Sequence, residues 1–316
     1  MKTSLLEALV CEQEDVGSLD RGTIQAIQLK KLNRLLARER ARGGFYRDAA
    51  ERLRTLDGLA DLPLTTRADL LQLSAAPLPG AQSAVHCARE SDDAGDTLRI
   101  FYSENDIENA IRFYMAALGE LTGPGGSVLI SLPFSGADAP AEWLAEAATR
   151  LGAKPLRAES SARGALGELL KEEKPEVYVG PPAPLLELLR ADGKGSLRRA
   201  LLCFDGCSPE ELAECEARLG SKPFLLYGSR ETCFAAAVGC QAQEGMHLRE
   251  NHVIAEILDK DGRRLPDGEV GELVITTIGL EAQPLIRYRT EAAARILPTP
   301  CPCGCALLRL ELMDGA

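Results

Sequence analysis

Between residues 97 and 227, short apolar runs of the kind found in β-strands alternate with segments that carry helix-start signals. The segment after Ser208 is the clearest, because Pro209 occupies the first helical position and Glu211 lies three residues after the cap. Strands that alternate with helices are typical of a mainly parallel sheet covered by helices. The strand-like runs are 98–102, 128–132, 176–179, 200–204 and 223–227, and the other helices are expected to start near Ser103, Ala139 and Pro182.

After Tyr227 the helical pattern stops and strand-like runs continue alone. Asp261-Gly262 is typical of a hairpin turn between two of these runs. An antiparallel, barrel-like unit is therefore expected to follow the parallel sheet. Its strand-like runs are 234–238, 253–258, 270–276 and 285–288.

Helices are expected at the start of the chain. One long helix is predicted from Asp20 to about Arg42, ended by Gly43-Gly44, and a second helix entry, capped by a threonine, is indicated at 62–70. The predicted fold class is α/β. An N-terminal helical region over 1–96 precedes a mainly parallel, helix-covered region over 97–227, and a β-rich, barrel-like subdomain covers 228–316.

Charge and composition exclude several classes of function. A net charge of −11 argues against nucleic acid as a partner, because such binding rests on neutralising phosphates. No apolar run approaches the roughly 18–20 residues that a membrane span needs. The first residues lack a cleavable signal pattern, and ten cysteines then fit a reducing compartment. A cytoplasmic protein is expected, in which clustered cysteines more often bind metal than form disulfides.

Four motifs follow one another between residues 223 and 305. They are Tyr-Gly-Ser-Arg-Glu at 227–231, Gly-Glu-Leu-Val-Ile-Thr-Thr at 271–277, Pro-Leu-Ile-Arg-Tyr-Arg-Thr at 284–290 and Cys-Pro-Cys-Gly-Cys at 301–305. In this order and spacing the chain resembles the adenylate-forming enzymes, and within them the phenylacetate–coenzyme A ligase family. The resemblance covers that family's large N-terminal domain almost end to end. The small C-terminal domain, which should follow the cysteine motif, is expected to be absent.

The resemblance implies a site for ATP or AMP with Mg²⁺. Tyr227 would lie against the nucleotide, and Glu231 would be the catalytic residue that holds Mg²⁺. Gly228, Tyr288 and Arg289 would complete the site, together with Arg230, which stands where the family has Ser or Thr. A strand end followed by a surface Arg–Glu pair is the plainer interpretation of the first motif, and both stay open.

Other parts of the expected nucleotide site depart from the family pattern. The phosphate loop falls at 90–97, where the sequence carries four acids and Asp96 replaces the lysine. At an effective dielectric of about 20, one unit-charge repulsion at about 4 Å costs about 4 kcal/mol. Ala292 occupies the position of the aspartate that would bind the ribose hydroxyls. Glu291 could replace that aspartate only if the register of the strand shifts. The adenine shelf falls at 204–206 and the acyl-pocket wall at 131–136.

Cysteines and a histidine provide the strongest positive signal for a bound group. By the same resemblance, Cys240, His247, Cys301 and Cys303 would form a Cys₃His zinc site, the ligand chemistry that tetrahedral Zn²⁺ favours. Cys305 could replace one of these ligands or remain free. An accidental grouping of unrelated residues is the alternative.

Two functions are compatible with these features. The first is an adenylate-forming protein with reduced or lost ATP-dependent acyl activation, acting as a zinc-stabilised module that binds an acyl group or a protein partner. The alternative is an active AMP-forming acyl-CoA ligase with an altered nucleotide site or a C-terminal domain supplied by a partner. A small carboxylic acid is the expected small-molecule ligand, and a homodimer is compatible with the resemblance.

Overall fold

The computed structural model describes residues 4–49, 52–75, 84–91, 97–134, 140–158, 163–191, 193–203 and 207–313. The helices are α1 (Leu5–Glu14), α2 (Arg21–Arg42), α3 (Arg67–Ala75), α4 (Glu104–Gly119), α5 (Pro140–Arg150), α6 (Arg163–Glu173), α7 (Pro182–Ala191) and α8 (Pro209–Leu219), with 3₁₀ turns at Leu56–Asp61 and Arg230–Thr232. The strands are β1 (Ala84–Ser91), β2 (Thr97–Ser103), β3 (Ser127–Ser131), β4 (Lys154–Ala158), β5 (Val177–Gly180), β6 (Arg199–Cys203), β7 (Phe224–Tyr227), β8 (Ala237–Gly239), β9 (Met246–Leu248), β10 (Val253–Leu258), β11 (Gly271–Thr277), β12 (Tyr288–Ile296) and β13 (Arg309–Leu312).

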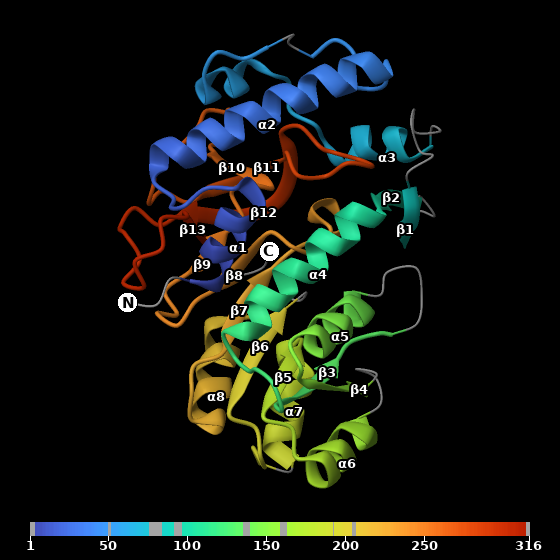
Figure 1. Cartoon of the computed structure of the whole chain (residues 1–316), viewed down its shortest axis with the longest axis vertical. Coiled ribbons are helices and arrows are strands. Elements are labelled where there is room, and N and C mark those ends of the chain that lie inside the picture. The colour runs from blue at the N-terminus through green and yellow to red at the C-terminus, as the bar shows by residue number, and fades with distance from the viewer. Residues whose placement is uncertain are drawn as a thin grey trace.

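A single 11-stranded sheet forms the centre of the molecule, in the order β10-β11-β12-β13-β9-β8-β7-β6-β5-β3-β4. Strands β3 to β7 pair in parallel, which confirms the expected α/β class. Strands β8 to β13 pair antiparallel and extend the same sheet in an open order, where the sequence predicted a barrel-like unit. In Figure 1, α2 crosses the antiparallel end, α5 to α8 surround the parallel end, and α4 runs diagonally between them.

Three strand predictions were wrong in detail. The run at 234–238 is strand only at its end, where β8 begins. The run at 98–102 lies in β2, which pairs antiparallel with β1 in a separate two-stranded sheet, because β1 directly precedes it in the chain. The run at 285–288 is strand only at its end, where β12 begins. In residues 285–287, backbone N–H groups donate hydrogen bonds to side chains instead of to a neighbouring strand. The N–H groups of Leu285 and Arg287 donate to the hydroxyls of Thr277 and Thr276 at 2.7 and 3.0 Å.

The predicted helix ends follow local hydrogen bonds. The Asp20 carboxylate accepts the Thr23 N–H at 2.6 Å at the start of α2, and Gly43 ends the helix with φ of 68°. Ser208 and Glu211 form a reciprocal capping box at α8. These ends were predictable because each depends on residues within one turn of the chain.

The antiparallel end of the sheet is tied to the N-terminal region through Arg287. Its guanidinium donates to both carboxylate oxygens of Glu256 at 3.0 Å, and to the carbonyl oxygens of Ala60 and Leu62 at 2.8 and 2.7 Å. The side chains of Arg287 and Glu256 are each 5% exposed. This buried ion pair therefore holds the segment before α3 against β10.

None of the helices in the described ranges is both long and apolar enough for a bilayer span.

Candidate functional site

The first candidate site lies where β7 ends, at the carboxyl edge of the parallel strands, the usual place for ligands in open α/β sheets. The backbone turns sharply there. A Cβ at Gly228 would lie 2.2 Å from the carbonyl carbon of Phe234, so only glycine permits this close approach. The turn leads into the short 3₁₀ helix that carries Arg230 and Glu231.

Tyr227, Glu231 and Tyr288 come together at this edge. The Tyr288 hydroxyl donates to the Glu231 carboxylate at 3.3 Å, and both residues are buried. Burial raises the pKa of both tyrosines, and the nearby Glu231 carboxylate raises each further. Both phenols therefore stay protonated at neutral pH, and the single O–H of Tyr288 is donated to Glu231. The structure thus joins two segments that lie 57 residues apart in the sequence.

Two of the predicted residues are arranged differently. Arg289 is exposed and forms a salt bridge with Glu272 at 2.5 Å, because successive residues of a strand point to opposite faces. Arg230 is half-buried, and its carbonyl oxygen accepts the Tyr102 hydroxyl at 2.6 Å. The Arg289 guanidinium therefore lies outside the group of Tyr227, Glu231 and Tyr288.

A bulge interrupts β12 next to this group. The β11–β12 register shifts between Glu272 and Val274, and Glu291 adopts the left-handed region with φ of 62°. Bulges re-aim side chains relative to a regular strand. The Glu291 carboxylate contributes to the raised pKa of Tyr288, while Ala292 is buried. Glu291 could replace an aspartate at position 292 only if the strand were irregular there. The bulge in β12 is such an irregularity.

Several predicted parts lie outside the described residues: 92–96 of the phosphate loop, 204–206 of the adenine shelf, and Ser135 and Gly136 of the acyl-pocket wall. A group of aromatic rings lies around Trp143 on α5. The ring centroid of Trp143 lies 5.5 Å from that of His86, 5.9 Å from that of Tyr102 and 6.2 Å from that of Phe234.

Sequence reasoning attached no role to His86. Its ring stacks on Tyr102 at 5.8 Å, and its Nε2 has no hydrogen-bond partner among the described residues. The strand hairpin of β1 and β2 places both rings together. No local sequence motif identifies His86, because the aromatic group that it joins includes residues of α5 and of the segment after the 3₁₀ turn at Arg230–Thr232.

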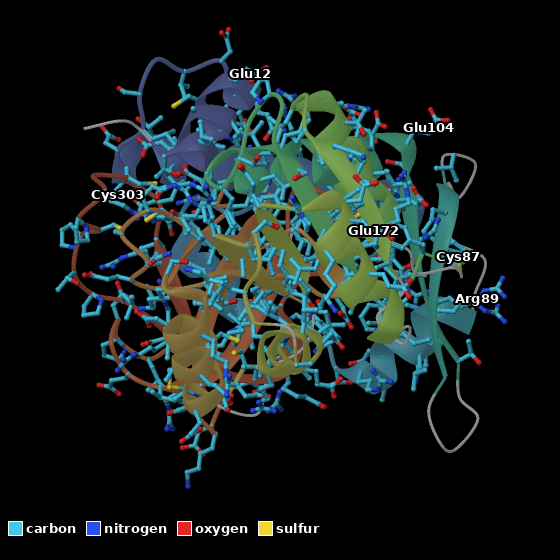
Figure 2. All side chains as sticks on the ribbon, turned by 90° about the horizontal axis from the view of Figure 1, so that it is seen from below. Glu12, Cys87, Arg89, Glu104, Glu172 and Cys303 are labelled. Carbon is cyan, nitrogen blue, oxygen red and sulfur yellow. The ribbon has the colours of Figure 1, made fainter. Side chains whose placement is uncertain are left out.

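The second candidate site is the Cys/His cluster, formed by Cys240, His247, Cys301 and Cys303. Their ligand atoms all lie within 4.8 Å of one another. Cys240 follows β8, His247 lies on β9, and the other two occupy the connection between β12 and β13. Figure 2 shows Cys303 on the side of the molecule opposite Cys87 and Arg89.

The geometry of the Cys/His cluster fits a tetrahedral zinc ion. The sulfurs of Cys240 and Cys301 are 3.7 Å apart, and two sulfur ligands of one tetrahedral zinc lie about 3.8 Å apart when each bond is about 2.3 Å. Nε2 of His247 is 3.3 Å from the Cys303 sulfur. The His247 Nδ1–H donates to the Leu307 carbonyl at 3.0 Å, which leaves the Nε2 lone pair directed at the thiols.

Burial disfavours charge in the Cys/His cluster when no cation is bound. It raises the pKa of Cys240 and brings that of Cys303 to about 12, and it lowers the pKa of His247. A divalent cation would reverse this by stabilising thiolates. Cys305 is buried beside the four residues, and its N–H donates to the Cys303 sulfur at 3.4 Å. It supports the cluster without being one of the four grouped ligands.

Comparisons with known proteins agree with this architecture. The model of the AMP-binding enzyme family matches residues 109–281. Phenylacetate-coenzyme A ligase of Escherichia coli is 28% identical over 314 residues, covering 90% of this chain and 69% of that enzyme. The enzyme of the same name from Thermus thermophilus is 27% identical and covers 96% and 72%.

Solved structures show the same fold. A 2-hydroxyisobutyryl-CoA ligase in complex with 2-HIB-AMP has a TM-score of 0.77 at 19% identity, over 92% of this chain and 67% of that one. The resemblance inferred from the four motifs is therefore confirmed. This chain belongs to the AMP-binding enzyme family and is similar to phenylacetate-coenzyme A ligases.

Proposed function

We propose that this chain is an adenylate-forming, phenylacetate-coenzyme A ligase-like domain whose ATP-dependent acyl activation is reduced or lost, and whose Cys/His cluster holds structural zinc. One observation carries the proposal. Tyr227, Glu231 and Tyr288 remain together at the sheet edge, while Ala292 occupies the position of the ribose-binding aspartate and Arg289 is paired with Glu272.

The retained group favours nucleoside binding over triphosphate binding. The two tyrosines offer ring faces to a base or sugar, and the Glu231 carboxylate is a suitable oxygen ligand for Mg²⁺. The acids of the 90–96 segment oppose an anion with three phosphates. The aromatic group around Trp143 suits an apolar acyl ligand such as the phenylacetate named for the relatives. A protein partner would give such a module its role.

The balance between AMP and ATP tests this proposal. We expect AMP to bind at least as tightly as Mg-ATP, because the additional phosphates of ATP contribute little binding energy and are repelled by the acidic 90–96 segment. Isothermal titration of the zinc-loaded protein with each nucleotide measures the ratio. Mg-ATP binding more than about tenfold tighter than AMP, about 1.4 kcal/mol, would contradict the proposal.

The alternative, an active AMP-forming acyl-CoA ligase with an altered nucleotide site or a partner-supplied C-terminal domain, is favoured by the bulge that brings Glu291 near Tyr288. In that case Glu231→Gln is expected to reduce carboxylate-dependent pyrophosphate exchange by about 100-fold or more, because the amide is a poor Mg²⁺ ligand. The exposed Arg263→Gln serves as the control. Full exchange activity in Glu231→Gln would exclude the Mg²⁺ role.

A further inference from the structure

A cavity of about 430 Å³ lies between α1, α2, α4 and the connection from β11 to β12. Cations dominate its lining. Lys31, Arg34 and Arg38 reach it from α2 and Arg112 from α4, against two carboxylates, Glu14 and Glu281. This is a local excess of positive charge on a chain whose net charge is −11. None of the residues assigned above to the nucleotide site or to the Cys/His cluster lines it.

The two carboxylates leave much of this charge uncompensated. Glu14 pairs with Lys31 at 2.7 Å, but Glu281 accepts hydrogen bonds from Asn105 and Ser103. The side chain of Arg34 is exposed and forms neither a hydrogen bond nor an ion pair within the described part of the chain.

Arg38 and Arg112 each form an ion pair with a carboxylate outside the cavity lining, and Arg38 also donates to the carbonyl of Leu280, which lines the cavity. Arg112 pairs with Glu12, which lies at the molecular surface in Figure 2 and is 71% exposed. Arg38 pairs with Glu39 and donates to the Leu280 carbonyl. Solvent screening makes such partly exposed pairs weak, so both guanidinium groups could exchange them for a bound anion.

A buried arginine lies behind the cavity. Arg249 is 2% exposed and lines an adjoining space of about 10 Å³, room for about one water, which shares Asn109 and His252 with the larger cavity. Its guanidinium donates to Gln13 at 3.3 Å, but it forms no ion pair with a described residue and its Nε has no partner. A buried cation without a counterion is costly, and an anion in the cavity would offset that cost.

The titration of neighbouring groups reflects the same concentration of charge. Burial lowers the pKa of Lys31 and His252, and the positive charge of Arg249 lowers both further. Arg34 also lowers the pKa of Lys31 and Arg112 that of His252, while the paired Glu14 carboxylate raises that of Lys31. Bound negative charge would relieve this repulsion.

We propose that this cavity binds a small molecule that carries two or more phosphate groups. Arginine forks match phosphate oxygens in bidentate hydrogen bonds, and here they approach from two different helices. The volume lies within the range of about 300–1,000 Å³ that is usual for small-molecule sites. Two separated cationic walls favour a ligand with charge at more than one position.

Pyrophosphate without added Mg²⁺ is the probe. Isothermal titration at low ionic strength is expected to show saturable binding to the full chain. The double variant Arg34→Gln/Arg112→Gln is expected to bind about 100-fold more weakly, since losing a hydrogen bond to a charged group costs about tenfold or more at each position. Arg263→Gln, which removes an exposed charge from the β10–β11 turn, should bind like the unmodified chain.

Further variants separate this site from the nucleotide site. Pyrophosphate affinity should be unchanged in Glu231→Gln, and citrate should bind at least about tenfold more weakly than pyrophosphate if the site selects phosphate. Thermal melting shows whether the double variant folds, and Arg34→Gln alone, a change at an exposed position, replaces it if it does not. Unchanged pyrophosphate binding in the arginine variants, or citrate binding of equal strength, would overturn the proposal.

Discussion

Cys303→Ser is expected to reduce the zinc content from about one ion per chain to about zero and to destabilise the fold. The serine hydroxyl is a poor zinc ligand, and three ligands leave an open coordination position. A ligand that binds only the folded state stabilises it by about 4 kcal/mol at 1,000 times its dissociation constant, so metal loss removes a stabilisation of that order. Elemental analysis and thermal melting measure the two effects.

Cys87→Ser is the matched control for this experiment. Cys87 is also a partly exposed cysteine, but it lies on β1 on the opposite side of the molecule in Figure 2. It should leave zinc content unchanged. Cys305→Ser tests the neighbouring thiol, and we expect it to retain zinc because four other ligand atoms already lie together. Zinc content that stays at one ion per chain in Cys303→Ser would eliminate the proposed zinc site.

Arg287→Met is expected to destabilise the chain by about 3–5 kcal/mol, the usual cost of breaking a buried ion pair by removing one partner. The change leaves Glu256 buried without a counterion and two carbonyl oxygens, of Ala60 and Leu62, without their donor. Methionine fills most of the vacated volume, so lost packing contributes little. Urea unfolding followed by circular dichroism measures the free energy of unfolding.

The control is two residues away in the same motif. Arg289→Met also removes an arginine from an ion pair, but the Arg289 side chain is 44% exposed. Exposed pairs contribute about 0–1 kcal/mol, so this variant should unfold close to the unmodified chain. Equal stability of the two variants would show that the Arg287–Glu256 pair does not anchor the N-terminal region.

Local signals explain which elements were predictable. The ends of α2 and α8 follow caps at Asp20 and Ser208, whose hydrogen bonds reach only three residues along the chain. The parallel strands β3, β5, β6 and β7 were predicted from their alternation with helices, whereas β4 and α6 between them were missed. The β1–β2 hairpin was missed because strand pairing depends on the partner as well as on the run itself. The segment 285–287 was predicted to be a strand from its apolar pattern. That pattern does not reveal that threonine hydroxyls accept hydrogen bonds from N–H groups of this segment.

The fold class, the helix ends and the kinds of residue available for metal and nucleotide could be predicted from the amino-acid sequence, because they depend on local hydrogen bonds and on motif spacing. Contacts between residues far apart in the chain depend on tertiary packing. The partnership of Arg287 with Glu256 and the cationic cavity beside Arg249 join segments far apart in the chain and were not predicted. The four residues of the Cys/His cluster were expected from the resemblance, and the structure adds that their ligand atoms lie within 4.8 Å of one another. Such contacts arise from packing of whole helices and strands, which no short stretch of sequence encodes.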